Sequence, residues 1–143
     1  MENKKLELRR YGLVPYNISP IQQGIQYGHT GDEFSLRVIK HILSPNDENK
    51  LPQDLVDRYL DWLENWKTYI ILNGGTTNLN PDRLGTMNKH LQTLKDNDIP
   101  VFEFYEPDLG DQLTGIVFIV DERVFKKKPY FPGDTSYPDF YDY

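Results

Sequence analysis

The sequence contains no cysteine, which excludes a disulfide framework, a thiolate zinc site and a cysteine nucleophile. It also lacks any run of about 18 apolar residues, and its longest near-continuous apolar run covers only residues 116–120. The polar residues 1–5 are followed by no apolar segment of the kind that a secretory signal peptide requires. We therefore expect no membrane span and no secretion by a signal peptide, and we expect the protein to be cytoplasmic.

Basic residues are outnumbered by acidic ones, 16 against 22, which gives a net charge of −6 at pH 7. Proteins that bind nucleic acids broadly usually present a clustered basic surface that neutralises phosphates. The charge balance therefore disfavours general binding to polynucleotides.

The sequence does contain enough apolar residues for a core. Hydrophobic residues make up 38% of the 143 residues and charged residues 27%, which is typical of a folded protein rather than a disordered one. This length suits one domain. We assign residues 1–125 to an α/β domain and residues 126–143 to a C-terminal tail that is aromatic and contains prolines.

The tail at residues 126–143 allows two interpretations. Its prolines favour an extended conformation, so the tail can wrap around the domain or stay partly disordered. Its acidic and aromatic composition also suits a segment that docks into a partner. The sequence leaves both interpretations open.

The hydrophobic pattern predicts helices and strands in the order β-α-α-β-α-β-β. Apolar runs indicate strands at residues 6–15, 68–72, 100–105 and 114–120. Helices are expected from Pro20 to about Leu43, from Pro52, and from the Asn80-Pro81 pair onward. This order predicts an α/β fold, a single domain with a small mixed four-stranded sheet flanked by helices. The last strand is apolar on both faces and should lie inside the sheet.

The first predicted helix has a clear start and an apolar side. Ser19 can cap the helix with its hydroxyl group, and Pro20 suits the first helical position because its missing N–H is not needed there. Glycine is costly inside a helix, so Gly24 and Gly28 predict close contact between this helix and the sheet. The spacing places five residues on the buried face: Ile21, Ile25, Gly28, Leu36 and Ile39.

The second predicted helix carries an aromatic stripe. Tyr59, Trp62 and Trp66 fall at spacings of three and four residues, so we expect them to belong mostly to the core.

Residues 19–30 form the densest polar segment next to a predicted strand end. Ligands of open α/β sheets gather at such places, because loop side chains and helix N-terminal N–H groups converge there. Gln22 and Gln26 share one face of the helix and are candidate ligand-binding residues. His29 follows three residues later and can act as a base or a hydrogen-bond donor, although a lone histidine in a helix is more often structural.

A second polar segment, residues 106–114, joins the last two predicted strands. It holds the carboxylates of Glu106, Asp108 and Asp111 and ends at Thr114. These groups can supply an acid or a base, or they can simply turn the chain. The segment lacks the later glutamate of a calcium loop, no metal-binding histidine spacing occurs, and the glycine loop at residues 73–77 lacks the lysine of a phosphate-binding loop. We therefore expect neither a metal nor a cofactor.

Several short stretches follow one another in a recognisable order. Gln26-Tyr27-Gly28-His29 lies in the first helix, Ile99-Pro100-Val101 opens a later strand, and the acidic Glu106-Pro107-Asp108-Leu109 leads to Leu113-Thr114-Gly115-Ile116. With the elements around them, these stretches resemble the type 2 peptidyl-tRNA hydrolase family, in particular its small homologues encoded by tailed phages. The resemblance covers roughly residues 6–120 and implies that fold.

The resemblance also implies where the catalytic groups of the family fall. Its catalytic lysine falls on Gln22, whose neutral amide cannot supply a cation to a phosphate or an ester oxygen. Its catalytic aspartate falls on Asp108 or Glu106, and the hydroxyl closest to its threonine is that of Thr114. In the related fold the start of the first helix approaches the loop before the last strand, so His29 and Asp108 are expected to lie near each other.

Two functions follow from this resemblance. The first is a phage-encoded binding or accessory protein, catalytically impaired, whose partner in the host cytoplasm is a host protein or a small nucleotide-like ligand. The second is an esterase that hydrolyses peptidyl-tRNA or a related RNA conjugate, with Asp108 as base, His29 in a positioning role, and Thr114 or Gln26 binding the substrate. We favour the first function, because Gln22 replaces the lysine and the net charge is acidic.

Overall fold

The computed structural model describes residues 6–78 and 83–126. The tail from residue 127 onward lies outside this part of the chain, and so does the Asn80-Pro81 pair. The elements follow one another as β1 (Leu8–Val14), α1 (Pro20–Leu43), α2 (Gln53–Asp61), a π-helical turn (Trp62–Trp66), β2 (Tyr69–Asn73), α3 (Thr86–Asp96), β3 (Phe102–Glu106), a 3-10 turn (Pro107–Leu109), β4 (Gln112–Asp121) and α4 (Glu122–Phe125).

The four strands form one mixed sheet in the order β2-β1-β4-β3. β1 runs parallel to β2, and β4 runs antiparallel to both of its neighbours, β1 and β3. The carboxyl ends of β1, β2 and β3 therefore meet at one edge, which we name the carboxyl edge of the sheet. The arrangement confirms the predicted single α/β domain with a small mixed sheet, and it places the apolar strand β4 inside that sheet.

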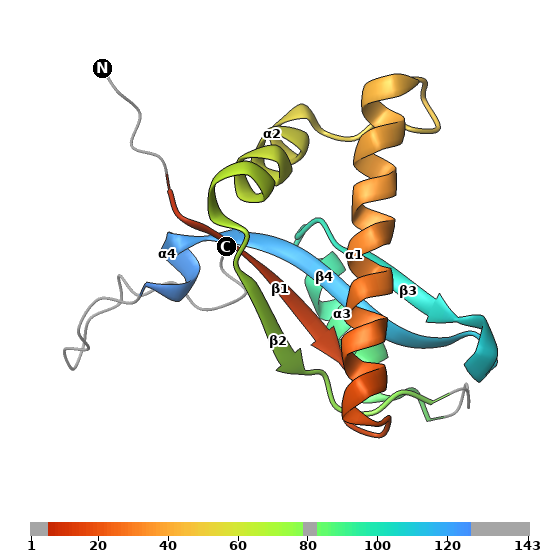
Figure 1. The fold of residues 1–143 in the computed structure, drawn as a ribbon. Helices are drawn as coiled ribbons and strands as arrows, with labels where there is room; N and C mark the ends of the chain where they lie inside the picture. Colours follow the sequence, from red (N-terminus) through yellow and green to blue (C-terminus); the bar gives the residue numbers. More distant parts are fainter. Residues whose placement is uncertain (1–5, 79–82, 127–143) are drawn as a thin grey trace, which may run out of the picture.

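Helices cover both faces of the sheet (Figure 1). α1 and α2 lie on one face, where Phe34, Val38 and Trp62 share an apolar cluster with Val117 and Ile119 of β4. α3 lies on the other face, and its apolar side chains pack on the residues that alternate with these along β4. The core therefore consists of two apolar layers, one on each side of β4.

Helix α1 begins as the sequence predicts. Ser19 caps it by accepting a hydrogen bond from the backbone N–H of Gln22 at 3.2 Å, and Pro20 is its first residue. The helix then runs continuously to Leu43 and crosses the sheet from the carboxyl edge to the level of α2 (Figure 1).

The predicted buried face of α1 is wrong. Its five residues are all exposed, and Ile21 reaches an exposed fraction of 78%: Ile21, Ile25, Gly28, Leu36 and Ile39. The face that packs on the sheet is the opposite one and is partly polar: Gln26, Tyr27, Thr30, Gly31, Phe34 and Val38. The error has a physical cause, because both sides of α1 carry apolar residues and hydrophobic spacing alone does not show which side the sheet covers.

The glycines that were expected to bring α1 onto the sheet do not do so. A Cβ atom built on Gly24 or Gly28 meets no other atom within 4 Å. The close approach is instead made from β4, since a Cβ atom on Gly115 would overlap the hydroxyl of Thr30 and lie 3.0 Å from the carbonyl oxygen of Gln26. A glycine inside a strand often marks such an approach.

A buried arginine holds the junction of β1, α1 and the π-helical turn. The guanidinium carbon of Arg10 lies 4.5 Å from the ring centre of Tyr69, 4.7 Å from that of Trp62 and 5.0 Å from that of Tyr27. Its Nε donates to the hydroxyl of Tyr27 at 3.4 Å. Cation-π contacts strengthen when water is excluded, so this aromatic cage stabilises the buried charge.

The aromatic stripe is mostly core, which confirms the prediction. Tyr59 and Trp62 are buried, and Trp66 is partly buried against the same cluster. The indole N–H of Trp62 donates to the carbonyl oxygen of Thr68 at 3.0 Å, which satisfies its one polar group inside the core.

The third helix begins later than predicted. Its first residue is Thr86, after Gly85, and not a residue next to the Asn80-Pro81 pair. In the described parts of the chain, no helix is both long enough and apolar enough to cross a membrane.

Candidate functional site

A buried polar network joins α1 to β3 and β4 at the carboxyl edge of the sheet. At its centre is Gln26, whose exposed fraction is 1%. The side-chain nitrogen of Gln26 donates to Oε2 of Glu106 at 2.9 Å and to Oε1 of Gln22 at 3.3 Å. The side-chain oxygen of Gln26 accepts a hydrogen bond from the hydroxyl of Thr114 at 2.6 Å. The two polar segments singled out in the sequence therefore meet in one site.

A β-bulge brings Thr114 into this network. Phe104 of β3 pairs with Gly115 of β4. The next residue of β3, Tyr105, pairs with Leu113, so Thr114 is an extra residue in β4. Leu113 packs on the α3 side and Gly115 contacts α1, and a bulge can turn the residue between them to either face. Thr114 is thereby directed toward α1, where its hydroxyl finds a partner.

Glu106 is a carboxylate that the network holds in its ionised form. Its Oε2 accepts the hydrogen bond from Gln26, and its Oε1 accepts one from the backbone N–H of Asp108 at 3.2 Å. The bond from Gln26 and then the bond from Asp108 lower the pKa of Glu106, although burial acts in the opposite direction. The positive charge of His29 adds a smaller effect of the same sign. Glu106 is therefore a charged acceptor at neutral pH.

His29 lies beside the network rather than within it. Its ring stacks on that of Phe104, with the ring centroids 4.9 Å apart and the planes inclined by 23°. Phe104 precedes Glu106 by two residues on β3, so the imidazole stands near the carboxylate. The side chain of His29 is exposed and can offer a ring nitrogen to a molecule bound at this edge.

Asp108 occupies the outer end of the site. It lies in the 3-10 turn Pro107–Leu109, where its backbone N–H donates to Glu106 and its side chain is exposed. Glu106 thereby caps this turn, which is the chain-turning chemistry that the sequence offered as one alternative for the acidic loop. A direct approach of the Asp108 and His29 side chains stays a prediction, and both residues act on Glu106.

Thr30 and Gly115 belong to the site, and sequence reasoning missed both. Thr30 is fully buried, and its hydroxyl donates to the carbonyl oxygen of Gln26 at 2.7 Å. Its position four residues after Gln26 puts it on the same helix face, and a glycine inside an apolar strand signals a close approach of backbone. These two signals could have identified the buried face of α1.

The glycine loop after β2 uses its N–H groups within the protein. The backbone N–H of Gly75 donates to the side chain of Asn73 at 2.8 Å, and that of Thr76 donates to the hydroxyl of Thr86 at 2.6 Å. Gly75 has a φ angle of 89°, and a Cβ atom there would overlap Thr86, so the turn requires glycine. The loop fastens β2 to the start of α3 and does not resemble a cradle for phosphate.

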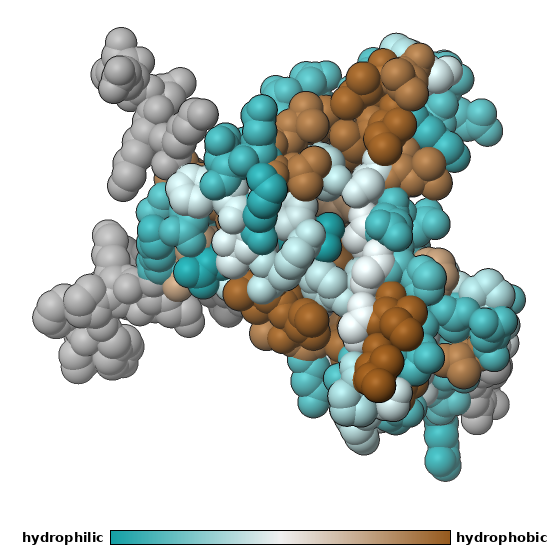
Figure 2. All heavy atoms as spheres, in the orientation of Figure 1, coloured by the Kyte–Doolittle hydropathy of each residue, from teal (hydrophilic) through white to brown (hydrophobic). Residues whose placement is uncertain are grey.

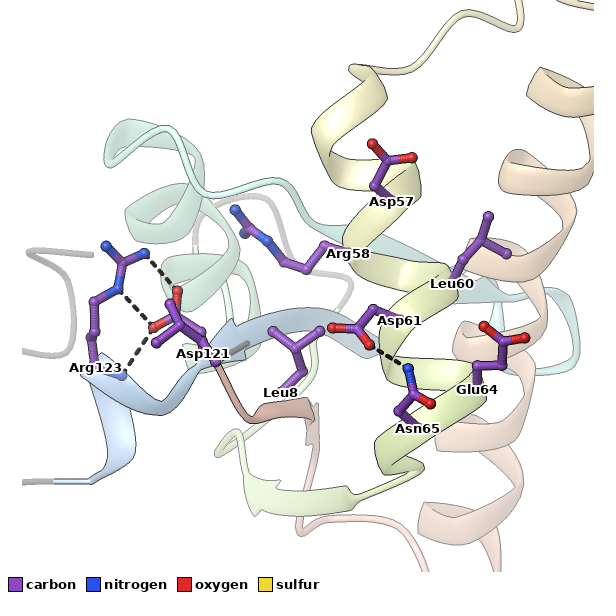
Figure 3. A pocket seen from close by; sticks show the side chains of 10 residues that line it. Leu8, Asp57, Arg58, Leu60, Asp61, Glu64, Asn65, Asp121 and Arg123 are labelled. Carbon is purple, nitrogen blue, oxygen red and sulfur yellow. Dashed lines mark hydrogen bonds and ion pairs between the residues drawn. The ribbon is translucent and has the colours of Figure 1, made fainter. Parts of the chain in front are cut away.

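A separate groove lies at the opposite edge of the sheet, between α2 and the junction of β1, β4 and α4 (Figure 3). It has a volume of about 580 Å³. On one side Arg123 and Asp121 form an ion pair at 2.6 Å, and on the other Asn65 donates to Asp61 at 2.6 Å. Charged side chains of both signs line it: Asp57, Arg58, Asp61, Glu64, Asp121 and Arg123. The groove shares no residue with the Gln26 network and is a distinct feature of the surface.

In the part of the chain that the structure describes, no three acidic or histidine side chains are grouped so as to hold a metal ion. No family model, no curated protein and no solved structure matches the chain.

The hydroxyl and the carboxylate of the Gln26 network are already engaged in hydrogen bonds within the protein. A hydroxyl nucleophile needs an adjacent base to take its proton, but the proton of Thr114 points to the amide oxygen of Gln26, which is not a base. Glu106 already accepts two hydrogen bonds. The side chains of Gln22 and His29 face solvent here, and Gln22 also accepts the hydrogen bond from Gln26.

Proposed function

We propose that this chain is a binding or accessory protein without hydrolase activity, on a scaffold related to type 2 peptidyl-tRNA hydrolases. The element order β-α-α-β-α-β-β supports the relation. The meeting of residues from both polar segments at the carboxyl edge supports it further, since the resemblance implies a site made from those two segments.

One observation supports the proposed absence of hydrolase activity. Gln22 stands where the resemblance implies a catalytic lysine, and its side chain does no more than accept a hydrogen bond from Gln26. A neutral hydrogen bond is about half as strong as a charge-assisted one. Loss of a single donor to a developing oxyanion typically lowers turnover by ~10²- to 10³-fold. A site with Gln22 in this place therefore lacks one charge-assisted donor, and its turnover should be strongly reduced.

The charges at the carboxyl edge favour a protein partner over a nucleotide-like ligand. Glu106, Asp108 and Asp111 place three carboxylates there, and their charges repel phosphate. Gln22 and His29 are exposed and can exchange hydrogen bonds with the backbone or side chains of another protein. We propose a protein of the host cytoplasm as the partner, bound at this edge.

An esterase acting on peptidyl-tRNA or a related RNA conjugate is the alternative, and one observation favours it. Glu106 is buried, its pKa is lowered, and the charge of His29 acts on it. Carboxylates with a shifted pKa are common in active sites. In this function Asp108 or Glu106 serves as base, His29 positions the substrate, and Thr114 or Gln26 binds it.

Hydrolysis of peptidyl-tRNA by the purified chain distinguishes the two functions. We expect no turnover above that of buffer, and no change in the variants Glu106→Gln and Asp108→Asn. Asp47→Asn, in the exposed loop after α1, is the matched control for loss of a carboxylate. Turnover that disappears in Glu106→Gln but persists in Asp47→Asn would establish the esterase and refute the binding protein.

Binding of labelled tRNA tests the partner class. We expect any binding to vanish at physiological salt, because the carboxyl edge offers carboxylates rather than a basic surface. Salt-resistant binding would favour the RNA-directed alternative. Turnover gained by Gln22→Lys would show that the rest of a hydrolase site is retained.

A further inference from the structure

The side of α1 that faces away from the sheet carries an apolar stripe along the whole helix. Its members follow one another at spacings of three and four residues, and all of them are exposed. Five are aliphatic, one is a glycine and one, in the middle, is acidic: Ile21, Ile25, Gly28, Asp32, Leu36, Ile39 and Leu43. Hydrophobic residues lie over both ends of α1 on the face shown in Figure 2. A surface helix normally carries polar residues on this side, so the α1 stripe is a candidate contact surface.

The residues of the α1 stripe have the same spacing whether the helix is read from its N-terminus or from its C-terminus. Asp32 is at its middle, Ile25 and Ile39 lie seven residues to either side, and Ile21 and Leu43 lie eleven residues to either side. An antiparallel second copy would therefore place Ile25 of one chain against Ile39 of the other, and Ile21 against Leu43. A two-fold dimer requires a surface of this self-complementary kind.

Gly28 fits the same arrangement. It lies four residues before Asp32 and Leu36 lies four residues after, so Leu36 of one copy would cover Gly28 of the other. Nothing in the described chain requires glycine here, because a Cβ atom on Gly28 would meet open space. The distance between packed helix axes, about 8–10 Å, depends on the side chains at the contact, and a glycine opposite a leucine allows a close approach. A contact outside the chain accounts for a residue that otherwise weakens the helix.

Two polar side chains near the middle of the stripe can interact across the pair. His29 precedes Asp32 by three residues, so in the antiparallel pair each Asp32 comes within one helical turn of His29 from the second copy. The two Asp32 carboxylates also face each other at the two-fold axis. This like-charge contact weakens the pair, so removal of the charge at position 32 should strengthen association.

We propose that two copies of this chain associate through the α1 stripe as an antiparallel helix pair centred on Asp32. The stripe runs from Ile21 to Leu43, which is about 33 Å at about 1.5 Å per residue, so the contact extends along the full helix. The proposal rests on the aliphatic residues of the outer side of α1 and does not depend on the function proposed for the carboxyl edge, with which it shares His29.

Sedimentation velocity of the full chain over a range of concentrations tests the pair. We expect the mass to rise from 16.8 kDa toward twice that value with concentration. Ile25→Lys and Ile39→Glu should each weaken association at least ~10-fold, because each puts a charge into the apolar contact. Ile71→Lys, at an exposed isoleucine of β2, is the matched control and should associate like wild type. Thermal unfolding by circular dichroism shows that each variant is folded.

Two further variants test the register. In a mixture of Ile25→Lys and Ile39→Glu chains, the introduced lysine and glutamate face each other across the antiparallel pair, so a mixed dimer should form more readily than either variant pairs with itself. Asp32→Asn should tighten association. A wild-type chain that stays monomeric up to several hundred micromolar, or a mixture that forms no mixed dimer, would overturn the proposal.

Discussion

Gln26 and Glu106, 80 positions apart in the chain, are joined by a hydrogen bond of 2.9 Å from the side-chain nitrogen of Gln26 to Oε2 of Glu106. This bond connects the first half of α1 to the carboxyl end of β3. The hydroxyl of Thr114 adds β4 to the same amide group. The site therefore exists only when all three elements are in place, and its polar contacts contribute to the stability of the fold as well as to its surface chemistry.

Removal of the Thr114 hydroxyl should destabilise the protein. Thr114→Val keeps the shape but leaves the buried side-chain oxygen of Gln26 without a donor, which costs about 1–3 kcal/mol in the free energy of unfolding. Urea denaturation measures this loss. The matched control is Thr93→Val on α3, whose hydroxyl bonds to the carbonyl oxygen of Lys89 at the surface and whose loss should cost no more than about 0.5 kcal/mol. Equal stability of Thr114→Val and wild type would show that the network does not hold the fold.

The lowered pKa of Glu106 should make stability depend on pH. A carboxylate with a lower pKa in the folded state stabilises the protein above its unfolded pKa of about 4.5, and this contribution is lost as the pH falls through the folded-state pKa. The difference in unfolding free energy between wild type and Glu106→Gln should therefore be constant near neutral pH and shrink below about pH 4.5.

Urea denaturation of both proteins at a series of pH values measures this difference. Glu64→Gln, at an exposed carboxylate of the π-helical turn, provides the control for removal of a charge. A wild type and a Glu106→Gln variant that lose stability in parallel as the pH falls would contradict the expected titration.

Alanine at two glycines should have opposite effects. Gly115→Ala should lower the free energy of unfolding by about 1–3 kcal/mol, because its Cβ atom overlaps Thr30 and crowds the carbonyl oxygen of Gln26. Gly28→Ala should raise it by up to about 1 kcal/mol, because alanine favours the helix and the space there is open. Thermal or urea unfolding in dilute solution gives both values. A loss of stability in Gly28→Ala would mean that α1 is packed differently at this point.

Lysine cannot replace Arg10 in its aromatic cage. Arg10→Lys puts a compact, strongly hydrated ammonium among the rings of Tyr27, Trp62 and Tyr69, and we expect a loss of about 1–2 kcal/mol. Arg37→Lys on the exposed side of α1 serves as control and should be nearly neutral. The change in indole fluorescence on unfolding reports both transitions. An Arg10→Lys variant as stable as wild type would show that the planar guanidinium is not required.

The outline of the fold follows from local signals. Ser19 and Pro20 predict the start of α1 because capping chemistry depends on neighbouring residues only. The continuous apolar run of β4 predicts an interior strand because both of its faces need cover. Signals of this kind do not depend on knowing how distant parts of the chain pack.

The packing face of α1 could not be predicted in the same way. Its outer side has the stronger aliphatic pattern, with Ile21, Ile25 and Leu43, while its inner side includes Gln26 and Thr30, whose burial is offset by hydrogen bonds to residues far along the chain. The β-bulge at Thr114 is also a property of paired strands, since a single strand with period two would direct Thr114 to the α3 side. The candidate residues were visible in the sequence, but the face on which they meet depends on the tertiary fold.

The position of β4 has a consequence for folding during synthesis on the ribosome. β1 and β4 are the two middle strands of the sheet, and their paired residues, such as Leu8 and Asp121, lie at opposite ends of the described chain. The second middle strand, β4, is therefore made only when nearly all of the described residues have been synthesised. At about 5–20 residues per second, roughly 5 to 20 s separate the synthesis of β1 from that of β4. During this interval α1 can pack on β1 and α2, through contacts such as Tyr27 with Arg10 and Phe34 with Tyr59, but it lacks the cover that β4 supplies. Because β4 pairs with both β1 and β3, we expect a truncation before β4 to yield an aggregating fragment rather than a smaller stable domain.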